Sequence, residues 1–356
     1  MVKDVAIFNG EQVIEKTSVL VENGQISKVN ANIDANVTII DGGGKFLMPA
    51  LTNSHVHAFM QFNLREAAQA GVLNLMDMHG LETFQATMAK TSMDSINMAR
   101  YFYAGYAATA PDGHGTQFGF PVPTLTKPSE AKKFVEDRVT AGASYIKIIE
   151  EPWKPTVSHE IVKSLVTAAH KANTIAVVHI SKVDDAIKVL SNKANGLVHI
   201  WWDKKISEEA LDKLVKNESF FVIPTILTSE LALENIRKTA PAGSFMNNEE
   251  ISAEVKRLHD AGVPILAGTD PPNANINYGT DLYKEMDLMS KAGIPNLDVL
   301  KGATSYPAKY FQLENTGFLK VGYKADMILL NADPIKDIQN ISKINTIWKE
   351  GHIVKK

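Results

Sequence analysis

Short apolar runs alternate with amphipathic helical patterns between residues 51 and 315, and no other feature constrains the fold as strongly. Three helical patterns end in an alanine–glycine pair, at Ala141-Gly142, Ala261-Gly262 and Ala292-Gly293. Glycine after the last helical turn releases the chain into the next element. Repeated strand–helix units imply a parallel sheet in an α/β protein. A stretch of about 260 residues is the usual size for eight such units closed into a (β/α)8 barrel.

Individual runs indicate where the elements of this barrel lie. Apolar runs rich in β-branched residues predict buried strands at 145–149, 175–179, 196–200, 220–223 and 263–267. Helical patterns fill the intervals, for example at 184–190 and 208–215. The chain therefore favours an alternating order of elements over this whole stretch.

The two ends of the chain have a different character, because both are rich in short strand patterns. The apolar runs 5–8 and 18–21 end at Asn9-Gly10 and Asn23-Gly24, and such pairs are typical of hairpin turns. Strand patterns return at 325–330 and 344–348. We expect residues 1–50 and 316–356 to meet in one small, discontinuous β domain beside the barrel domain of residues 51–315.

Composition narrows the possible partners. The chain has 37 Lys and Arg against 40 Asp and Glu, a net charge of −3 and no basic stripe, so nucleic acid is not an expected partner. It has no cysteine, so any metal must be held by His, Asp, Glu or modified side chains. We see no apolar signal segment and no membrane span, and we expect a cytoplasmic protein with a small-molecule substrate. The sequence is compatible with a homo-oligomer.

Polar residues gather at the ends of the predicted strands. His55 and His57 follow the apolar run 46–51, and alternate residues of a strand point to the same side. Asp270 follows the run 263–267, and Lys147 lies inside the run 145–149. His179 closes the run Ala-Val-Val-His, and His199 closes the run Gly-Leu-Val-His. Active sites of such barrels form at the carboxyl ends of the strands, so these side chains could surround a metal.

With these residues in place, the sequence resembles the amidohydrolase superfamily, and in particular its imidazolonepropionase- and prolidase-like branch. The resemblance covers nearly the whole chain. It includes Met48-Pro49, His55-x-His57, the strand lysine, the two strand-ending histidines, Gly268-Thr269-Asp270, Gly279-Thr280-Asp281-Leu282, Ala303-Thr304, Ala325-Asp326 and Gly351. It implies a distorted (β/α)8 TIM barrel with a small β-sandwich domain formed by both termini.

The resemblance also implies a metal site. His55, His57 and Asp270 would hold one ion, and His179 and His199 a second. Lys147 would be carboxylated by CO₂, and its carbamate would bridge the two ions. Zinc is the expected metal, although manganese, cobalt or iron could occupy the same ligands. CO₂ reacts with a neutral amine, and the apolar strand around Lys147 favours that form.

The reaction implied is hydrolysis of an amide C–N bond by a hydroxide that bridges the metals. Asp270 would act as the catalytic residue that takes the proton and passes it to the leaving group. The expected substrate is a dipeptide, an N-acyl amino acid or a similar small molecule. A lactonase or esterase, a mononuclear deaminase and a non-catalytic scaffold are the alternatives. Deaminases of this kind usually have His-x-x-Glu at the fifth strand, whereas His179 is followed by Ile180-Ser181-Lys182.

Several residues near the predicted strand ends are candidates for substrate binding. They are His114, Trp153, Trp201, Trp202 and Tyr278, with Arg65 as a lesser candidate. For the tryptophans, packing of loops against the barrel rim is an equally good interpretation. His79 could line the site or could be exposed in a loop. His159, His170 and His259 fall on helical patterns and are expected at the surface. Asn53 and Ala50 depart from the family pattern, in which Asp and Gly are usual.

Overall fold

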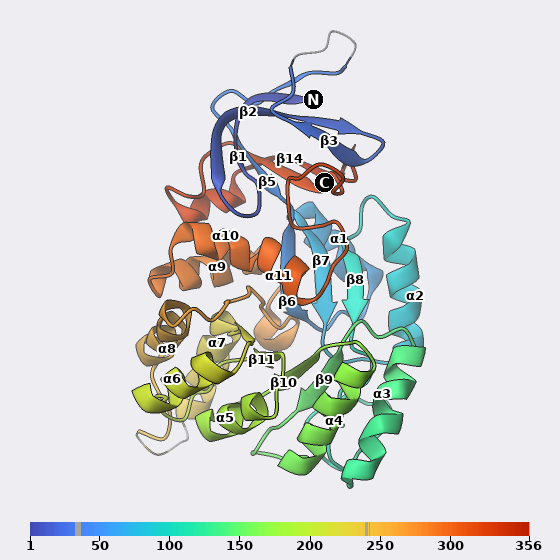
Figure 1. Cartoon of the computed structure of the whole chain (residues 1–356), viewed down its shortest axis with the longest axis vertical. Coiled ribbons are helices and arrows are strands. Elements are labelled where there is room, and N and C mark those ends of the chain that lie inside the picture. Colours follow the sequence, from blue (N-terminus) through green and yellow to red (C-terminus); the bar gives the residue numbers. More distant parts are fainter. Residues whose placement is uncertain (33–36, 239–240, 242, 356) are drawn as a thin grey trace.

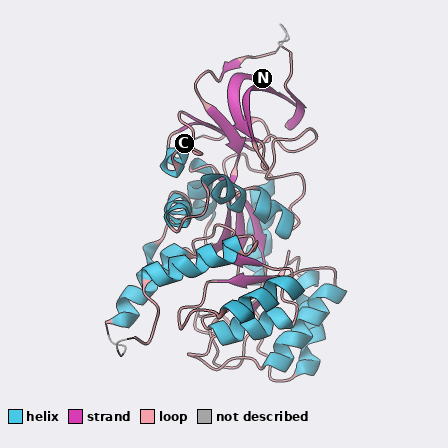
Figure 2. Ribbon diagram, turned by 60° about the vertical axis from the view of Figure 1, so that its left-hand side comes forward, coloured by secondary structure: helices cyan, strands magenta, loops and turns pink. Residues whose placement is uncertain are grey.

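The computed structural model describes residues 1–32, 37–238, 241 and 243–355. A sheet built from both termini lies at one end of the molecule, and the parallel strands with their helices make up the remainder (Figure 1). In a second view the parallel strands lie inside a surrounding set of helices (Figure 2). Among the described residues, no helix is long and apolar enough to cross a membrane.

The terminal sheet has eight strands that come from both ends of the chain. Its order is β15-β14-β13-β5-β1-β2-β3, with β4 on β1. The bounds are β1 Val2–Phe8, β2 Val13–Glu22, β3 Gln25–Val29, β4 Ile40–Asp41, β5 Phe46–Pro49, β13 Met327–Leu330, β14 Ile344–Lys349 and β15 His352–Ile353. The two ends meet where β5 pairs with β13, for example at Leu47 and Leu329.

The described strands of both termini form one hydrogen-bonded sheet, so the predicted β-sandwich is not confirmed. Apolar side chains from both ends of this sheet pack against one another: Trp348 of β14 shares a buried cluster with Val19 of β2 and Ile26 of β3. Alternating apolar residues suit a sandwich and a curled sheet equally well, so the pattern alone does not separate them. The domain boundaries at 50 and 316 stay a prediction.

Local turn chemistry explains the hairpin between β2 and β3. Asn23 and Gly24 both have a positive φ, of 51° and 78°. This is the backbone of a type I′ turn, whose twist matches that of the flanking strands. Glu22 and Gln25 pair directly across it. The predicted Asn-Gly hairpin is therefore confirmed.

The central part contains two parallel sheets. One is β6-β7-β8, with β6 Leu51–Val56, β7 Val72–Asp77 and β8 Arg100–Tyr103. The other is β12-β11-β10-β9, with β9 Ile146–Ile149, β10 Ala176–His179, β11 Gly196–Val198 and β12 Phe221–Ile223. The described strands do not form the single eight-stranded sheet that the sequence predicts.

The segment expected as the eighth strand is irregular. Residues 264–270 contain only one bridge, from Ile265 to Val222. Pro264, which has no N–H to donate, and Asp270, which has a left-handed backbone with φ 58°, limit the segment at its two ends. The segment still lies beside β6, because Ser54 N donates to Ala267 O (2.9 Å) and Asp270 N donates to His55 O (2.8 Å).

Helices follow most of the parallel strands and cover them. Their bounds are α1 Gln61–Gln69, α2 Glu82–Met93, α3 Ala131–Thr140, α4 His159–Lys171, α5 Val183–Ser191, α6 Glu208–Asn217, α7 Ile226–Arg237, α8 Asn248–Asp260, α9 Asp281–Lys291, α10 Asn296–Gly302 and α11 Ser305–Tyr310. Short 3-10 turns lie at η1 Pro128–Glu130, η2 Asn273–Asn275 and η3 Ile338–Ser342. Gly142, Gly262 and Gly293 follow α3, α8 and α9 with φ of +90°, +88° and +98°, which confirms the three predicted helix ends.

A buried ion pair joins the terminal sheet to the parallel strands. Arg100 of β8 is fully buried, and its guanidinium binds Asp326 just before β13, with Nη2 3.3 Å from Oδ1. The same guanidinium contacts Glu350 after β14 at 2.5 Å. These contacts fix the terminal sheet against the strands that carry the candidate site.

Candidate metal centre

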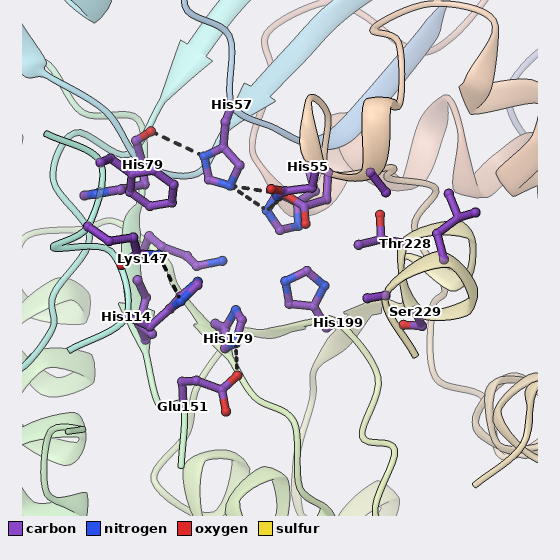
Figure 3. A pocket seen from close by; sticks show the side chains of 18 of the residues that line it. His55, His57, His79, His114, Lys147, Glu151, His179, His199, Thr228 and Ser229 are labelled. Atoms are coloured by element: carbon purple, nitrogen blue, oxygen red, sulfur yellow. Dashed lines mark hydrogen bonds and ion pairs between the residues drawn. The ribbon is translucent and has the colours of Figure 1, made fainter. Parts of the chain in front are cut away.

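Three ligand atoms from two distant segments form a nearly equilateral triangle. His55 Nε2, His57 Nε2 and Asp270 Oδ1 lie 3.3 Å from one another (Figure 3). Zinc binds imidazole and carboxylate at about 2.0–2.1 Å, and at tetrahedral angles such ligand atoms lie about 3.3 Å apart. The triangle therefore has the edge length that a bound zinc ion requires.

The local backbone sets this triangle. Asn53 Oδ1 accepts hydrogen bonds from His55 N (3.2 Å) and Thr269 N (3.1 Å), which joins β6 to the segment of Asp270. Gly268 is required because a Cβ there would lie 2.6 Å from Ile223 and 2.9 Å from His55 N. The departure from the family pattern at Asn53 thus serves to connect the two segments that supply the ligands.

A second pair of imidazoles faces this triangle. His179 ends β10 and His199 directly follows β11, and their ring centroids lie 4.6 Å apart. His199 is also 4.9 Å from the ring of His55. His199 has a left-handed backbone with φ 70°, an uncommon conformation for a residue with a side chain.

Hydrogen bonds decide which nitrogen faces the cavity in three of the four rings, those of His57, His179 and His199. Thr225 Oγ1 donates to Pro224 O (2.8 Å), so it accepts from His199 Nδ1 (2.6 Å) and leaves Nε2 with a free lone pair. His57 Nδ1 donates to the carbonyl of His79 (3.3 Å), which likewise leaves Nε2 as the ligand atom. Such partners orient metal-binding histidines.

Glu151 plays the same part for His179. Its Oε2 lies 2.9 Å from His179 Nε2, and its Oε1 accepts a hydrogen bond from Ser181 Oγ at 3.0 Å. His179 therefore keeps Nδ1 as its ligand atom. Sequence reasoning missed Glu151 and Thr225, because a carboxylate after a strand and a threonine before a helix are ordinary features.

Lys147 projects from β9 into the space between the two groups of ligands. Figure 3 shows its nitrogen directed toward the space between His57, His179 and His199. The side chain is buried, and burial lowers the pKa of Lys147 to about 7. A large fraction of the amine is therefore neutral near neutral pH, and the neutral form is the one that reacts with CO₂.

Electrostatics keep most of the imidazoles neutral. Burial, followed by the charges of neighbouring basic groups, holds the pKa of His55, His179 and His199 well below the usual value. Burial also lowers the pKa of His57, but the Asp270 carboxylate outweighs this effect and raises it. Neutral imidazoles have the free lone pair that a metal ligand needs.

The candidate ligands form one wall of a cavity of about 480 Å³. The other residues that line it are His79, His114, Gln117, Phe118, Ile149, Glu151, Trp202, Thr228, Ser229, Leu231, Ala232, Asn273 and Ala274. Two of the predicted substrate-binding residues, His114 and Trp202, are among them. The ring of His114 lies 5.2 Å from that of His179.

The other predicted substrate-binding residues do not line this cavity. Trp201 is fully buried, and its Nε1 donates to Glu254 (3.1 Å), so it packs in the core. Trp153 is 55% exposed and packs against Phe245. Tyr278 lies behind the site, where its hydroxyl donates to His57 O (2.6 Å). These positions favour packing and positioning roles over substrate contact.

The remaining histidines take varied places. His79 is buried rather than exposed: Ala107 N donates to its Nδ1 (2.9 Å), its Nε2 donates to Gly115 O (3.0 Å), and burial lowers its pKa to about 3. His170 is exposed, as predicted, whereas His159 and His259 are half-buried. Arg65 is exposed and does not line the cavity.

Fold and site together define an α/β protein with a candidate metal centre at the ends of parallel strands. Residues 46–354 match the amidohydrolase family, and the chain belongs to it. It is 25% identical to a 5-methylthioadenosine/S-adenosylhomocysteine deaminase of Pyrococcus furiosus, over 91% of this chain and 84% of that protein. The predicted resemblance to the amidohydrolase superfamily is thereby confirmed.

Solved structures share the fold over the whole chain. A Xaa-Pro dipeptidase with bound methionine superimposes with a TM-score of 0.85 at 21% identity, and covers 100% of this chain and 99% of that one. A putative prolidase from Bifidobacterium longum gives 0.83 at 22% identity, with 100% and 94% covered. The sequence relative and these structures differ in their activities, so the comparisons support hydrolysis of a C–N bond and leave the substrate open.

Proposed function

We propose that this chain is a binuclear, metal-dependent amidohydrolase that cleaves an amide C–N bond in a small substrate. The proposal rests mainly on the 3.3 Å triangle of His55 Nε2, His57 Nε2 and Asp270 Oδ1. His179 Nδ1 and His199 Nε2 would hold a second ion. Lys147, as a carbamate, would lie between the two, and zinc suits these ligands.

When bound, the ions would supply a water of lowered pKa and polarise the substrate carbonyl. The chain's own residues carry the proton. Asp270 lies in the cavity wall beside the candidate ligands and is 5% exposed, so its carboxylate can take the proton of the attacking water and give it to the leaving nitrogen. The hydrogen bond from Asp270 N to His55 O (2.8 Å) fixes the backbone that carries this carboxylate.

A deaminase is the second candidate, favoured by the similarity to the Pyrococcus furiosus enzyme. Glu151 is the only carboxylate besides Asp270 among the described residues of the cavity wall. It already binds His179 and Ser181, which leaves it poorly placed to bind a purine ring. The buried Lys147 beside the ligands also favours the binuclear hydrolase.

We further propose that the contacts between β6 and residues 264–270, with the bridge from Ile265 to Val222, complete a distorted eight-membered barrel. The bridge from Ala108 to Ile148 joins the two parallel sheets on the other side. This arrangement brings the carboxyl ends of all the strands to one mouth, where the candidate ligands lie.

Activity before and after metal removal tests the proposal. The purified protein would be assayed against dipeptides, N-acyl amines, lactones and 5′-modified adenosines, then treated with chelator and reloaded with zinc. The proposal expects amide hydrolysis that is lost with the metal and restored by zinc. Ammonia release from adenosines alone would establish the deaminase, and a folded protein that binds no metal would establish a non-catalytic scaffold.

A further inference from the structure

The charges of the cavity wall restrict the substrate. Among the described residues that line it, Lys147 is the only lysine or arginine. Lys147 belongs to the candidate metal centre, so the described residues of the substrate-facing wall include no further lysine or arginine. Its acidic residues are Asp270, also in that centre, and Glu151. A substrate that reaches past the ions therefore meets a wall without a positive side chain.

The rest of that wall is apolar or neutral. Phe118, Trp202 and Leu231 supply aromatic and aliphatic area, while Gln117, Ser229 and Asn273 supply uncharged hydrogen-bonding groups. Phe118 is stacked near the ring of His57, with centroids 6.4 Å apart. Such a wall binds a flat or apolar substituent and orients it through neutral hydrogen bonds.

A free carboxylate would be poorly accommodated here. Transfer of an ionised carboxylate from water to the part of the wall beyond the ions is costly, because its hydration is lost there without an opposite charge from a side chain. Glu151, whose carboxylate is held by His179 and Ser181, adds a like charge to the same wall. Dipeptides and N-acyl amino acids carry such a carboxylate next to the scissile amide.

We propose that the substrate is an uncharged amide with an aromatic or apolar substituent, and that the enzyme discriminates against substrates with a free α-carboxylate. This inference rests on the proposed hydrolase function of the same site. It narrows the substrate class from amides in general to neutral ones.

Matched substrate pairs test the proposal on the metal-loaded protein. Each pair keeps the scissile amide and replaces the carboxylate by a hydroxymethyl group: N-acetylphenylalanine with N-acetylphenylalaninol, and N-acetylproline with N-acetylprolinol. We expect kcat/KM to be at least tenfold higher for the neutral member of each pair. Equal values, or a preference for the carboxylate, would overturn the inference.

A charge introduced into the wall provides the reverse test. Leu231 is half-buried on α7 and lines the cavity, so a longer side chain has room there. Leu231→Arg should improve kcat/KM for the carboxylate member relative to its neutral partner by about tenfold, since a guanidinium binds carboxylates in a bidentate manner. Leu231→Gln is the matched neutral control and should leave the original preference. An unchanged preference in a folded, active Leu231→Arg protein would contradict the inference.

Measurements of substrate binding test this inference independently of the proposed hydrolase function. If no amide is hydrolysed in a metal-dependent way, the hydrolase proposal fails. Dissociation constants for the same pairs, measured by calorimetry, still test the charge preference. We expect the neutral member to bind at least threefold more tightly, and tighter binding of the carboxylate member would overturn the inference whether or not turnover occurs.

Discussion

His55 Nε2 and Asp270 Oδ1 lie 3.3 Å apart, although β6 carries the first and the irregular segment before η2 carries the second. The backbone couples the two residues directly, because Asp270 N donates to His55 O at 2.8 Å. A change in either segment therefore moves both ligand atoms. This coupling underlies the predictions for Asp270 and Gly268.

Asp270→Asn should abolish most of the hydrolysis. The amide cannot accept the proton of the attacking water, and it weakens one ligand, so we expect kcat to fall by about 10²–10⁴-fold. Initial rates and metal content measured on the same preparation check this. Asp298→Asn, in an ion pair with His259 away from the cavity, is the matched control and should keep full activity. A fully active Asp270→Asn protein would exclude the assigned role.

Carbamate formation on Lys147 should depend on pH in a defined direction. Burial lowers the pKa of Lys147 to about 7, and only the neutral amine reacts with CO₂. At constant dissolved CO₂, the rate at which metal-free protein regains activity with zinc should rise about tenfold per pH unit below pH 7 and level off above it. Lys147→Met should not regain activity at any pH. A rate independent of pH would show that the lysine is not modified.

Thr225→Val should weaken metal binding without unfolding the protein. The variant removes the hydroxyl that accepts from His199 Nδ1, and loss of such an orienting partner typically costs about 10–100-fold in metal affinity. Thr225→Ser keeps the hydroxyl and is the matched control. Competition with a chromogenic chelator measures the affinities. Equal affinity in the valine and serine variants would contradict the proposed role of Thr225.

Gly268→Ala should disturb both packing and the site. The new Cβ would lie 2.6 Å from the Ile223 side chain and 2.9 Å from His55 N, and the backbone nitrogen cannot move aside cheaply. We expect a loss of about 1–3 kcal/mol in the free energy of unfolding, together with weaker zinc binding. Gly43→Ala, where the nearest atom would lie 3.3 Å away, should change neither quantity. Unaltered stability and affinity in Gly268→Ala would show that β6 can shift freely.

Replacing Arg100 should lower the free energy of unfolding more than replacing Glu350, its partly exposed partner. Arg100→Met leaves the buried Asp326 unpaired, so we expect a loss of about 3–5 kcal/mol. Glu350→Gln should cost less than about 1 kcal/mol, because Glu350 is 39% exposed. Chemical denaturation of both variants measures the difference.

Acid titration gives a second readout of this contact. Burial raises the pKa of Glu350, but Arg100 outweighs this effect and lowers it below the usual value. The stabilisation is therefore complete above the unfolded pKa of about 4.5 and is lost as the pH falls through the lower folded value. Glu350→Gln should flatten the stability curve below pH 4.5. A curve parallel to that of the parent protein would contradict this pairing.

Local signals in the sequence were sufficient for much of the fold. The glycines after α3, α8 and α9 and the Asn23-Gly24 turn depend only on backbone preferences, and they occur where predicted. The prediction of a regular eighth strand was not confirmed. The apolar run of this segment resembles a strand, but the described structure has only the bridge from Ile265 to Val222 there, between Pro264 and the left-handed backbone of Asp270.

Most of the candidate ligands could be found from the sequence because they lie at or near the ends of predicted strands, and Lys147 because a lysine inside a buried apolar run is unusual. Glu151 and Thr225, which orient the ligands, could not be found in this way. Each is recognised only by the imidazole that it contacts. The adjacent tryptophans show a similar limit. Trp201 points into the core and Trp202 lines the cavity, and the sequence does not specify which side of the loop faces which environment.

The metal content of the purified chain shows whether it holds a binuclear centre. Protein stripped with chelator and then dialysed against zinc and bicarbonate would be analysed by elemental mass spectrometry, alongside Lys147→Met and His199→Ala. We expect two zinc ions per chain in the parent protein and about one in each variant. A parent protein that is folded and retains no zinc would contradict this expectation.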